Sequence, residues 1–532
     1  MEPIFAAAST DYTPFWILAA GVAFVLFSII KLRLHPFLGL MLGALIVGML
    51  TPSLPELTLA NGFWEEKTGQ SDFLRAMNWA MSGFGVLVGK IGFVIAMAAI
   101  IGMCMMESGA ADKIVRRLMD TLGEERASWA MLLSGFILSI PVFFDTVFFL
   151  LIPLARALAL RTGKNYTLYI CAICAGGAIT HTMVPPTPGP LIIVENFRAE
   201  KITQVDPGMA IIAGLLVAIV PVLVGMWYSR RLNTSVNVPL RETRGASLEE
   251  LGAIVKKKDD ELPSFGLSLL PVVLPVVLIS AVTFIGLFKK MGLNLPDQLV
   301  TTLGFIGDKN LAMLLGAIIA MYTLARQRGW SLGKLGENMG SPLETAGVII
   351  LITGAGGAFG SMIKHTGISK TIESIGVQEG GVVAMLFMAW VLTAVIRAAQ
   401  GSATVSMITG SSIMAPIIYG MMEAGTLGCH PMYFCLVIGF GAFPLSWMND
   451  SGFWVVQRMS GFTEKETLQT WTKLLTLIGV VGLVQVLIFA TVLPLKPDKP
   501  EAAEASAKTA QVSSVPASAS PGNLLLPPRR QR

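Results

Sequence analysis

The sequence predicts an all-α, polytopic membrane protein made of two inverted repeats. Only 14% of its 532 residues are charged and 53% are hydrophobic, whereas a soluble domain carries about 25% charged residues. Apolar runs such as 15–30, 86–106 and 267–288 are long enough to cross a bilayer, which takes about 20 helical residues. Polar, helix-breaking stretches interrupt such runs at matching places in the two halves.

Each half is expected to contain the same elements in the same order: three helices, a hairpin, a broken helix and a final helix. The crossing helices are expected near 15–31, 36–50, 82–107, 166–195 (broken), 208–229, 266–288, 310–325, 342–363, 431–457 (broken) and 470–493. The hairpins are expected near 127–160 and 381–420, with arms of about 15 to 18 residues that fall short of a full span. We therefore expect both hairpins to be re-entrant, entering and leaving on the same side of the membrane.

This pattern divides the chain into a first transmembrane repeat (1–229), a cytoplasmic linker (230–265), a second repeat (266–495) and a disordered, Ala/Ser/Pro-rich tail (496–532). If the hairpin is not counted, each half crosses the membrane an odd number of times. The second half should therefore lie in the membrane with the opposite orientation to the first. Loop cations such as Arg156, Arg230 and Arg326 gather on one side. The positive-inside rule places that side in the cytoplasm and both termini in the periplasm. Full crossing by the hairpin arms would give the same topology, so the charges leave re-entrance open.

Each hairpin tip carries an ionisable residue inside an apolar segment, Asp145 in the first and Arg397 in the second. Such residues are costly in lipid and mark functional sites by default. Asp145 could instead cap the helix that follows it, although a cap at membrane depth would itself belong to a site. The planar guanidinium of Arg397 suits a carboxylate, but it could also snorkel to an interface or pair with an internal acid.

The breaks in the two broken helices supply a second set of polar side chains. Broken helices at corresponding positions of two repeats are the best sequence pointer to the binding site of a secondary transporter. Their half-helix N-termini suit an anion, and hydroxyl and amide side chains suit a polyhydroxylated body. The expected substrate contacts are Thr182, Arg397, Gln400, Ser402, Thr404, Asn449 and Ser451. The candidates for proton coupling are Asp145, His181 and Asp450, because each can change its charge.

Other classes of function find little support in the sequence. There is no Walker motif and no zinc-type His/Glu helix, so primary active transport by this chain alone is unsupported. We also expect no cofactor and no metal. Cys171-x-x-Cys174 has no further ligands beside it and is expected to be a buried, inert pair of thiols. The net charge is +5, but the basic residues cluster in short loops between apolar runs and do not indicate nucleic-acid binding. A passive channel and an aspartyl protease built on Asp145 and Asp450 remain as alternatives from other classes.

Five motifs resemble those of the gluconate permease (GntP) family. They lie at 140–145, 181–190, 354–360, 399–404 and 449–454, and the resemblance covers the chain to about residue 493. It implies a proton-coupled symporter for gluconate or a related sugar acid, moving by an elevator-type mechanism in a bacterial cytoplasmic membrane, with a homodimer as a further expectation. Thr187 stands where family members often have a second histidine, which weakens a relay of paired histidines. A sodium-coupled carboxylate symporter and a passive facilitator are the alternatives to proton symport.

Overall fold

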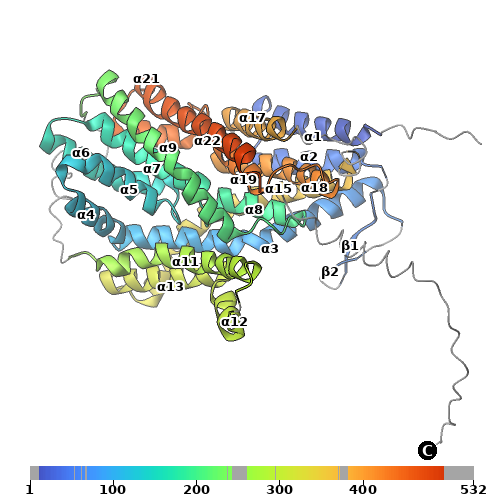
Figure 1. Cartoon of the computed structure of the whole chain (residues 1–532), viewed down its shortest axis with the longest axis horizontal. Helices are drawn as coiled ribbons and strands as arrows, with labels where there is room; N and C mark the ends of the chain where they lie inside the picture. Colours follow the sequence, from blue (N-terminus) through green and yellow to red (C-terminus); the bar gives the residue numbers. More distant parts are fainter. Residues whose placement is uncertain are drawn as a thin grey trace, which may run out of the picture.

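The computed structural model describes residues 11–52, 54–60, 63–65, 69–236, 238–241, 261–293, 295–368, 371 and 381–495. Across these residues the chain is almost entirely helical (Figure 1), which confirms the predicted all-α class. Within the described part, eight helices are long and apolar enough to cross a membrane, or nine if the bent pair α12–α13 is counted as one span. Most of the predicted linker and the whole predicted tail lie outside the described residues.

The first half runs from α1 to α9. Its helices are α1 (Thr13–Ile30), α2 (Pro36–Leu50), α3 (Asp72–Glu107), α4 (Ala110–Leu122), α5 (Ala127–Leu138), α6 (Phe144–Thr162), α7 (Tyr166–Met183), α8 (Pro188–Ala199) and α9 (Pro207–Ser235), with a 3-10 turn at Glu124–Arg126. A short antiparallel pair of strands, β1 (Thr58–Ala60) and β2 (Phe63–Glu65), lies between α2 and α3. The strands and the amphipathic helix α4 were not predicted. α3 also begins ten residues before its predicted start, where Ser71 accepts a capping bond from the Leu74 amide.

The second half runs from α11 to α22. Its helices are α11 (Phe265–Lys290), α12 (Asp297–Ile306), α13 (Lys309–Arg328), α14 (Leu332–Asn338), α15 (Gly340–His365), α17 (Val382–Gln400), α18 (Ala403–Glu423), α19 (Met432–Gly441), α20 (Ser451–Ser460), α21 (Glu464–Thr467) and α22 (Lys473–Val492), with a π-helical turn at Leu468–Thr472. The sequence predicted neither α12 nor α14. α12 meets α13 at a bend of 61° and projects from the rest of the molecule (Figure 1).

Both predicted hairpins and both broken helices are present as helix pairs. The arms are 12 and 19 residues long in α5 and α6, and 19 and 21 residues long in α17 and α18. The expected arm length of about 15 to 18 residues was therefore wrong, because α5 is shorter and the other three arms are longer. Both arms of the second hairpin are long enough to cross a membrane. Re-entrance of the hairpins stays a prediction.

Local chemistry explains where the helices break. Pro185, Pro186 and Pro188 follow the end of α7, and proline lacks the amide that would continue the helix. Pro188 itself occupies the first turn of α8, where no amide donor is needed. In the second hairpin α17 ends at Gly401, whose φ of +80° favours glycine. A side chain there would also meet the Asn449 carbonyl oxygen, 2.0 Å from the position of a Cβ.

The helices form two groups, which we call the framework and the core bundle. In the framework α3 packs along α15, α2 packs on α15, α13 packs on α3, and α1 and α11 cover α2 and α13. In the core bundle α5 packs on α7, α7 on α9, α17 on α19, and α19 on α22. The order of elements and their packing partners therefore recur in the two halves. The opposite orientation of the halves in the membrane stays a prediction.

Buried polar contacts join the two halves inside the core bundle. The Asn196 amide on α8 donates to the hydroxyls of Ser411 (2.7 Å) and Ser412 (3.1 Å) on α18. Arg156 on α6 is 1% exposed and donates to the Met459 carbonyl of α20 at 3.2 Å. Its assignment to the loop cations was therefore wrong, because it is buried against the end of α20. Each hairpin is thus tied to the broken helix of the other half.

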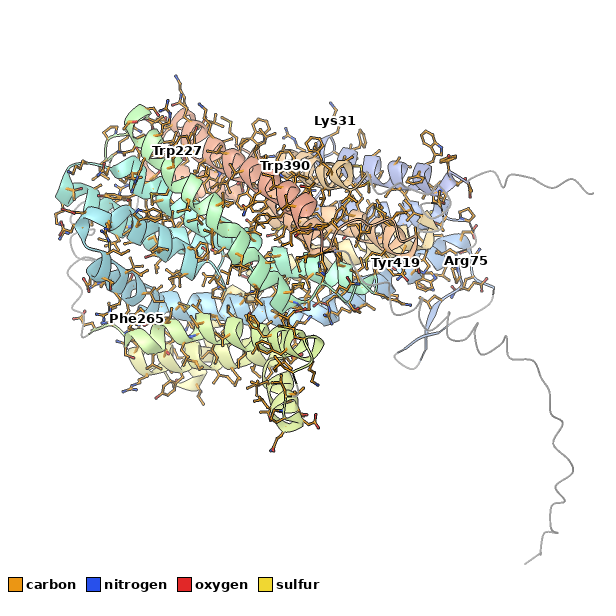
Figure 2. All side chains as sticks on the ribbon, viewed as in Figure 1. Lys31, Arg75, Trp227, Phe265, Trp390 and Tyr419 are labelled. Carbon is orange, nitrogen blue, oxygen red and sulfur yellow. The ribbon has the colours of Figure 1, made fainter. Side chains whose placement is uncertain are left out.

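Apolar side chains also cover the outer surface, as expected for helices that face lipid. Figure 2 shows them along the outer helices, with Trp227 of α9 labelled at the rim. Trp227 is 60% exposed and Trp16 of α1 is 74% exposed. Large contiguous apolar surfaces are rare on soluble monomers, so this surface agrees with a protein that spans a membrane several times.

Close helix packing in the core bundle gives a test of the fold. A Cβ at Gly176 of α7 would lie 2.0 Å from the Leu132 carbonyl oxygen of α5, whereas a Cβ at Gly85 of α3 would meet nothing within 4 Å. We expect Gly176→Ala to lose about 1–3 kcal/mol through overpacking, seen as a lower melting midpoint of the detergent-purified protein. Gly85→Ala should leave the midpoint unchanged or raise it, because alanine favours a helix. Equal midpoints for the two variants would contradict the α5–α7 packing.

Candidate functional site

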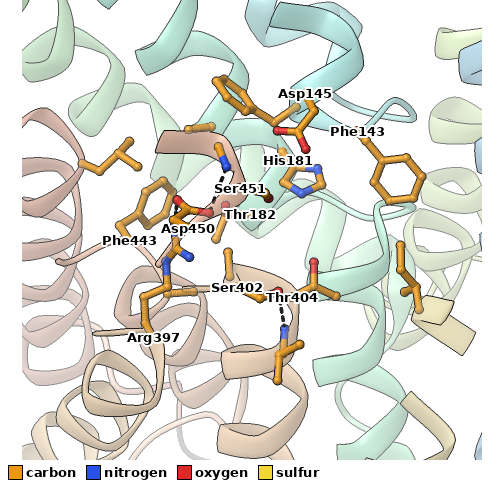
Figure 3. Close-up of a pocket in the computed structure, with 18 of the residues that line it drawn as sticks. Phe143, Asp145, His181, Thr182, Arg397, Ser402, Thr404, Phe443, Asp450 and Ser451 are labelled. Atoms are coloured by element: carbon orange, nitrogen blue, oxygen red, sulfur yellow. Dashed lines mark hydrogen bonds and ion pairs between the residues drawn. The ribbon is translucent and has the colours of Figure 1, made fainter. Parts of the chain in front are cut away.

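The hairpin tips and the helix breaks meet at a polar cavity of about 290 Å³ (Figure 3). Eight of the predicted site residues line it: Asp145, His181, Thr182, Arg397, Ser402, Thr404, Asp450 and Ser451. They come from four helix pairs that are far apart in the sequence. The prediction that these segments converge on one site thus agrees with the cavity, whereas the individual roles of the residues stay predictions.

Arg397 and Asp450 form a buried ion pair across the cavity wall. The Arg397 Nη2 donates to Asp450 Oδ2 at 2.5 Å, and the two side chains are only 3% and 7% exposed. Asp450 Oδ2 also accepts a hydrogen bond from Ser446, and Oδ1 accepts one from the Gly452 amide at 3.1 Å. Arg397 Nη1 donates to the Gly401 carbonyl, while its Nε has no hydrogen-bond partner in the described structure. Arg397 is therefore paired with an internal acid, which is one of the alternatives that its sequence position left open.

Asp145 and His181 lie on the opposite side of the cavity and face each other (Figure 3). Asp145 is in the first turn of α6, but the N-cap residue is Phe143 and no side chain caps that helix. Among the described residues no hydrogen bond is found for the Asp145 carboxylate. His181 is in the last turn of α7, and its buried Nδ1 likewise lacks a partner. Both side chains thus keep their hydrogen-bonding capacity for a ligand, water or each other.

The N-terminal turns of three helices line the cavity: α6, α18 and α20. Free amides and the positive end of the helix dipole favour an anion at such positions. Ser402 is the N-cap of α18 and accepts from the Val405 amide at 3.3 Å. The hydroxyls of Ser402, Thr404 and Ser451 border the same space (Figure 3). The site can therefore receive a carboxylate together with a hydroxylated chain.

Gln400 and Asn449, both predicted substrate contacts, do not line the cavity. Asn449 is exposed, and its amide donates to the Ala398 carbonyl at 2.7 Å, which ties the loop before α20 to the tip of the second hairpin. Trp447 donates to the same carbonyl at 2.9 Å. The Gln400 amide is buried without a hydrogen-bond partner in the described structure. The Thr187 hydroxyl donates to the Val184 carbonyl at 2.6 Å.

Sequence reasoning missed the wall that the framework contributes. Thr345, Ile349 and Ile352 of α15 close one side of the cavity. Their spacing places them on one face of the helix, but that spacing does not reveal what the face contacts. Aromatic side chains complete the lining: Phe143, Phe144, Phe443 and Trp471. The cavity therefore lies between the core bundle and the framework.

The described residues contain no group of three or more His, Cys, Asp or Glu side chains that could hold a metal ion. The five cysteines are free and buried. Asp145 and Asp450 line one cavity, but Asp450 is bound to Arg397, which does not resemble the shared-proton pair of carboxylates in an aspartyl protease.

Comparison with known proteins agrees with this arrangement. The model of the GntP family permease matches residues 13–492. The gluconate permease of Pseudomonas aeruginosa is 33% identical over 87% of this chain and 95% of its own length. The high-affinity gluconate transporter of Escherichia coli is 30% identical over 90% of this chain and 100% of its own length. The L-idonate transporter of the Gnt-II system of Escherichia coli is 29% identical over the same shares.

Solved structures show the same fold at low sequence identity. The YdaH transporter of Alcanivorax borkumensis superposes with a TM-score of 0.57 and 16% identity, covering 87% of this chain and 100% of that one. The predicted family and the prediction that the chain is not an enzyme are both confirmed by these comparisons. With its membrane-spanning helices and a family match over nearly the whole chain, this protein belongs to the GntP family of permeases.

Proposed function

We propose that this chain is a secondary active transporter that imports gluconate or a closely related sugar acid together with protons. The observation that carries the proposal is the polar cavity in which three helix N-termini, an arginine and several hydroxyls converge. Relatives named as gluconate and L-idonate transporters, at about 30% identity, support sugar acids as the substrate class. The membrane would be the bacterial cytoplasmic membrane, with both termini in the periplasm.

The substrate carboxylate would bind at Arg397 and the N-termini of α18 and α20. The hydroxyl groups of the substrate would form hydrogen bonds with Thr182, Ser402 and Thr404, whose side chains border the same space. The apolar face formed by Ile349 and Ile352 of α15 would limit the size of the substrate. A charged carboxylate leaves water at low cost only if donors replace its hydration, which these groups supply.

Coupling would follow from the Arg397–Asp450 pair. Asp450 holds the guanidinium with the geometry that a substrate carboxylate would need. When a proton neutralises Asp450, the guanidinium is free to bond to the incoming carboxylate. When the substrate leaves on the other side, Asp450 loses the proton and pairs with Arg397 again. Ser446, Asp145 and His181 also lie near this exchange, and the last two are candidates for a second proton site.

The direct test is uptake of labelled gluconate into proteoliposomes with an imposed pH gradient. We expect accumulation above equilibrium when the interior is alkaline, and loss of accumulation when a protonophore collapses the gradient. Uptake that ignores the gradient would remove the coupling claim, and uptake driven only by sodium would establish a sodium-coupled carboxylate symporter instead. A competition panel of sugar acids, short carboxylates and amino acids would then define the substrate.

Substitution of Asp450 tests the exchange. Proton binding at Asp450 favours substrate binding, so the affinity of the unmodified protein for gluconate should rise as the pH falls. Asp450→Asn should bind gluconate with an affinity that depends little on pH and should fail to accumulate it against a gradient. Asp120→Asn, an exposed position on α4, is the matched control and should behave like the unmodified protein. Full accumulation by Asp450→Asn would contradict the mechanism.

Substitution of Arg397 tests the carboxylate contact. A hydrogen bond to a charged group contributes about 1.5–3 kcal/mol, so Arg397→Gln should weaken gluconate binding by about tenfold to a hundredfold. Binding measured calorimetrically on folded, monodisperse protein checks this expectation. An unchanged dissociation constant would show that the arginine serves only the internal pair.

A further inference from the structure

We propose that the segment from Glu195 to Asp206, which joins α8 to α9, is a latch that fastens the core bundle to the framework in the conformation described here. Three polar contacts from this segment reach framework helices. None of them belongs to the candidate substrate cavity. The inference rests on transport by relative movement of the two bodies and not on the identity of the substrate.

The first contact is a buried ion pair between Glu195 and Lys309. Glu195 lies on α8 and its side chain is 3% exposed, while Lys309 begins α13 and is 17% exposed. α8 packs on α18 in the core bundle, whereas α13 packs on α3 and α11 in the framework. The pair thus crosses the boundary. Glu195 is nearly excluded from solvent, so its charge is stabilised by this partner.

The second contact joins the end of α8 to the end of α15. The Lys364 amine lies 3.1 Å from the Glu200 carboxylate, whose side chain is 7% exposed. The acids that make these pairs are therefore on the core bundle and the lysines are on the framework. Each of the two ion pairs attracts the core bundle to the framework at this end.

The third contact is at the start of α9. Asp206 Oδ1 accepts a hydrogen bond from the Thr283 hydroxyl of α11 at 2.6 Å, in addition to capping α9 through the Met209 amide at 3.0 Å. The start of α9 packs closely on α11 here: a Cβ at Gly208 would lie 2.2 Å from the Thr283 hydroxyl oxygen.

The interface around these contacts is loosely packed. A cavity of about 830 Å³ borders Glu195, Lys309 and Asp206, and another of about 350 Å³ borders Glu200 and Lys364 between α3, α15, α8 and α18. Where the first hairpin meets α3 and α4, at residues such as Met105 and Val147, the cavity is only about 10 Å³. The core bundle and the framework are thus joined here by ion pairs beside cavities large enough for water. Water can solvate the charged side chains as the two bodies separate.

The corresponding segment of the second half is bonded differently. At the end of α20, the carbonyls of Met459, Ser460 and Gly461 accept hydrogen bonds from Arg156, Tyr166 and Arg241, respectively. These donors belong to the core bundle and to the chain that follows α9. The polar contacts of Glu195, Glu200 and Asp206 therefore favour one conformation over the one that exposes the cavity to the other side of the membrane.

Transport requires these contacts to break. The substrate cavity lies between the core bundle and α15 of the framework, so alternating access needs one body to move against the other. Glu195 and Lys309 should then separate once in each cycle.

Cross-linking tests the separation. Glu195→Cys with Lys309→Cys, joined by a short bifunctional thiol reagent, should lose at least about tenfold in uptake, recover on reduction and still bind substrate. Arg241→Cys with Glu466→Cys is the matched control, because that ion pair at 2.6 Å does not cross to the framework. Its cross-link should leave uptake within about twofold of the reduced protein. The five native cysteines are buried, and protein without added cysteines sets the background.

Charge removal tests the same latch without relying on uptake. Thr345→Cys, on the framework wall of the cavity, is labelled from each side of the membrane with an impermeant maleimide. Adding Glu195→Gln and Glu200→Gln should raise the labelling rate from the side that is closed in the parent protein, relative to the rate from the other side, by about tenfold or more. The control substitution Glu466→Gln should leave the ratio of the two rates unchanged. An unchanged ratio, or full uptake by the cross-linked Glu195→Cys/Lys309→Cys protein, would overturn the proposal. Since labelling needs no substrate, it also distinguishes failure of the latch from failure of gluconate transport.

Discussion

The structure depends on the pairing of Arg397 with Asp450 in an apolar setting. A guanidinium at the tip of a hairpin and a carboxylate at a helix break are each costly in a membrane, and pairing lowers the cost of both. Together, at 2.5 Å, they hold the end of α17 against the start of α20. Asn449 adds a bond from the break to the Ala398 carbonyl. The same pair borders the cavity, so the contact that stabilises this part of the fold is also the one that the proposed carboxylate substrate would meet.

The two halves of the chain build one body around that cavity. Hydrogen bonds from Asn196 to the α18 hydroxyls and from Arg156 to the end of α20 tie each hairpin to the broken helix of the other half. The N-termini of α6, α18 and α20 consequently point at one space. Among the described residues, the framework contributes one wall, through α15. This division would let the site keep its internal contacts during the proposed movement of the core bundle.

The sequence identified residues of the site where a polar side chain interrupts a long apolar run. Such interruptions identified Asp145, His181, Arg397 and Asp450, all of which line the cavity. Side chains beside a break were harder to assign, because Asn449 bonds to the hairpin backbone instead of facing the ligand space. Features that depend on tertiary contact could not be predicted, such as the α15 wall and the β1–β2 pair. The buried acid Glu195 carried the same signal as Asp145 and was overlooked, but its partner on α13 could be found only in three dimensions.

The most direct measurement is a structure of the protein with gluconate bound, determined at a pH where uptake is fastest. The account predicts density for the substrate carboxylate on the Arg397 guanidinium, with the Asp450 side chain turned away from it and still close to Ser446. Density for the substrate elsewhere, with the Arg397–Asp450 pair intact, would contradict the account.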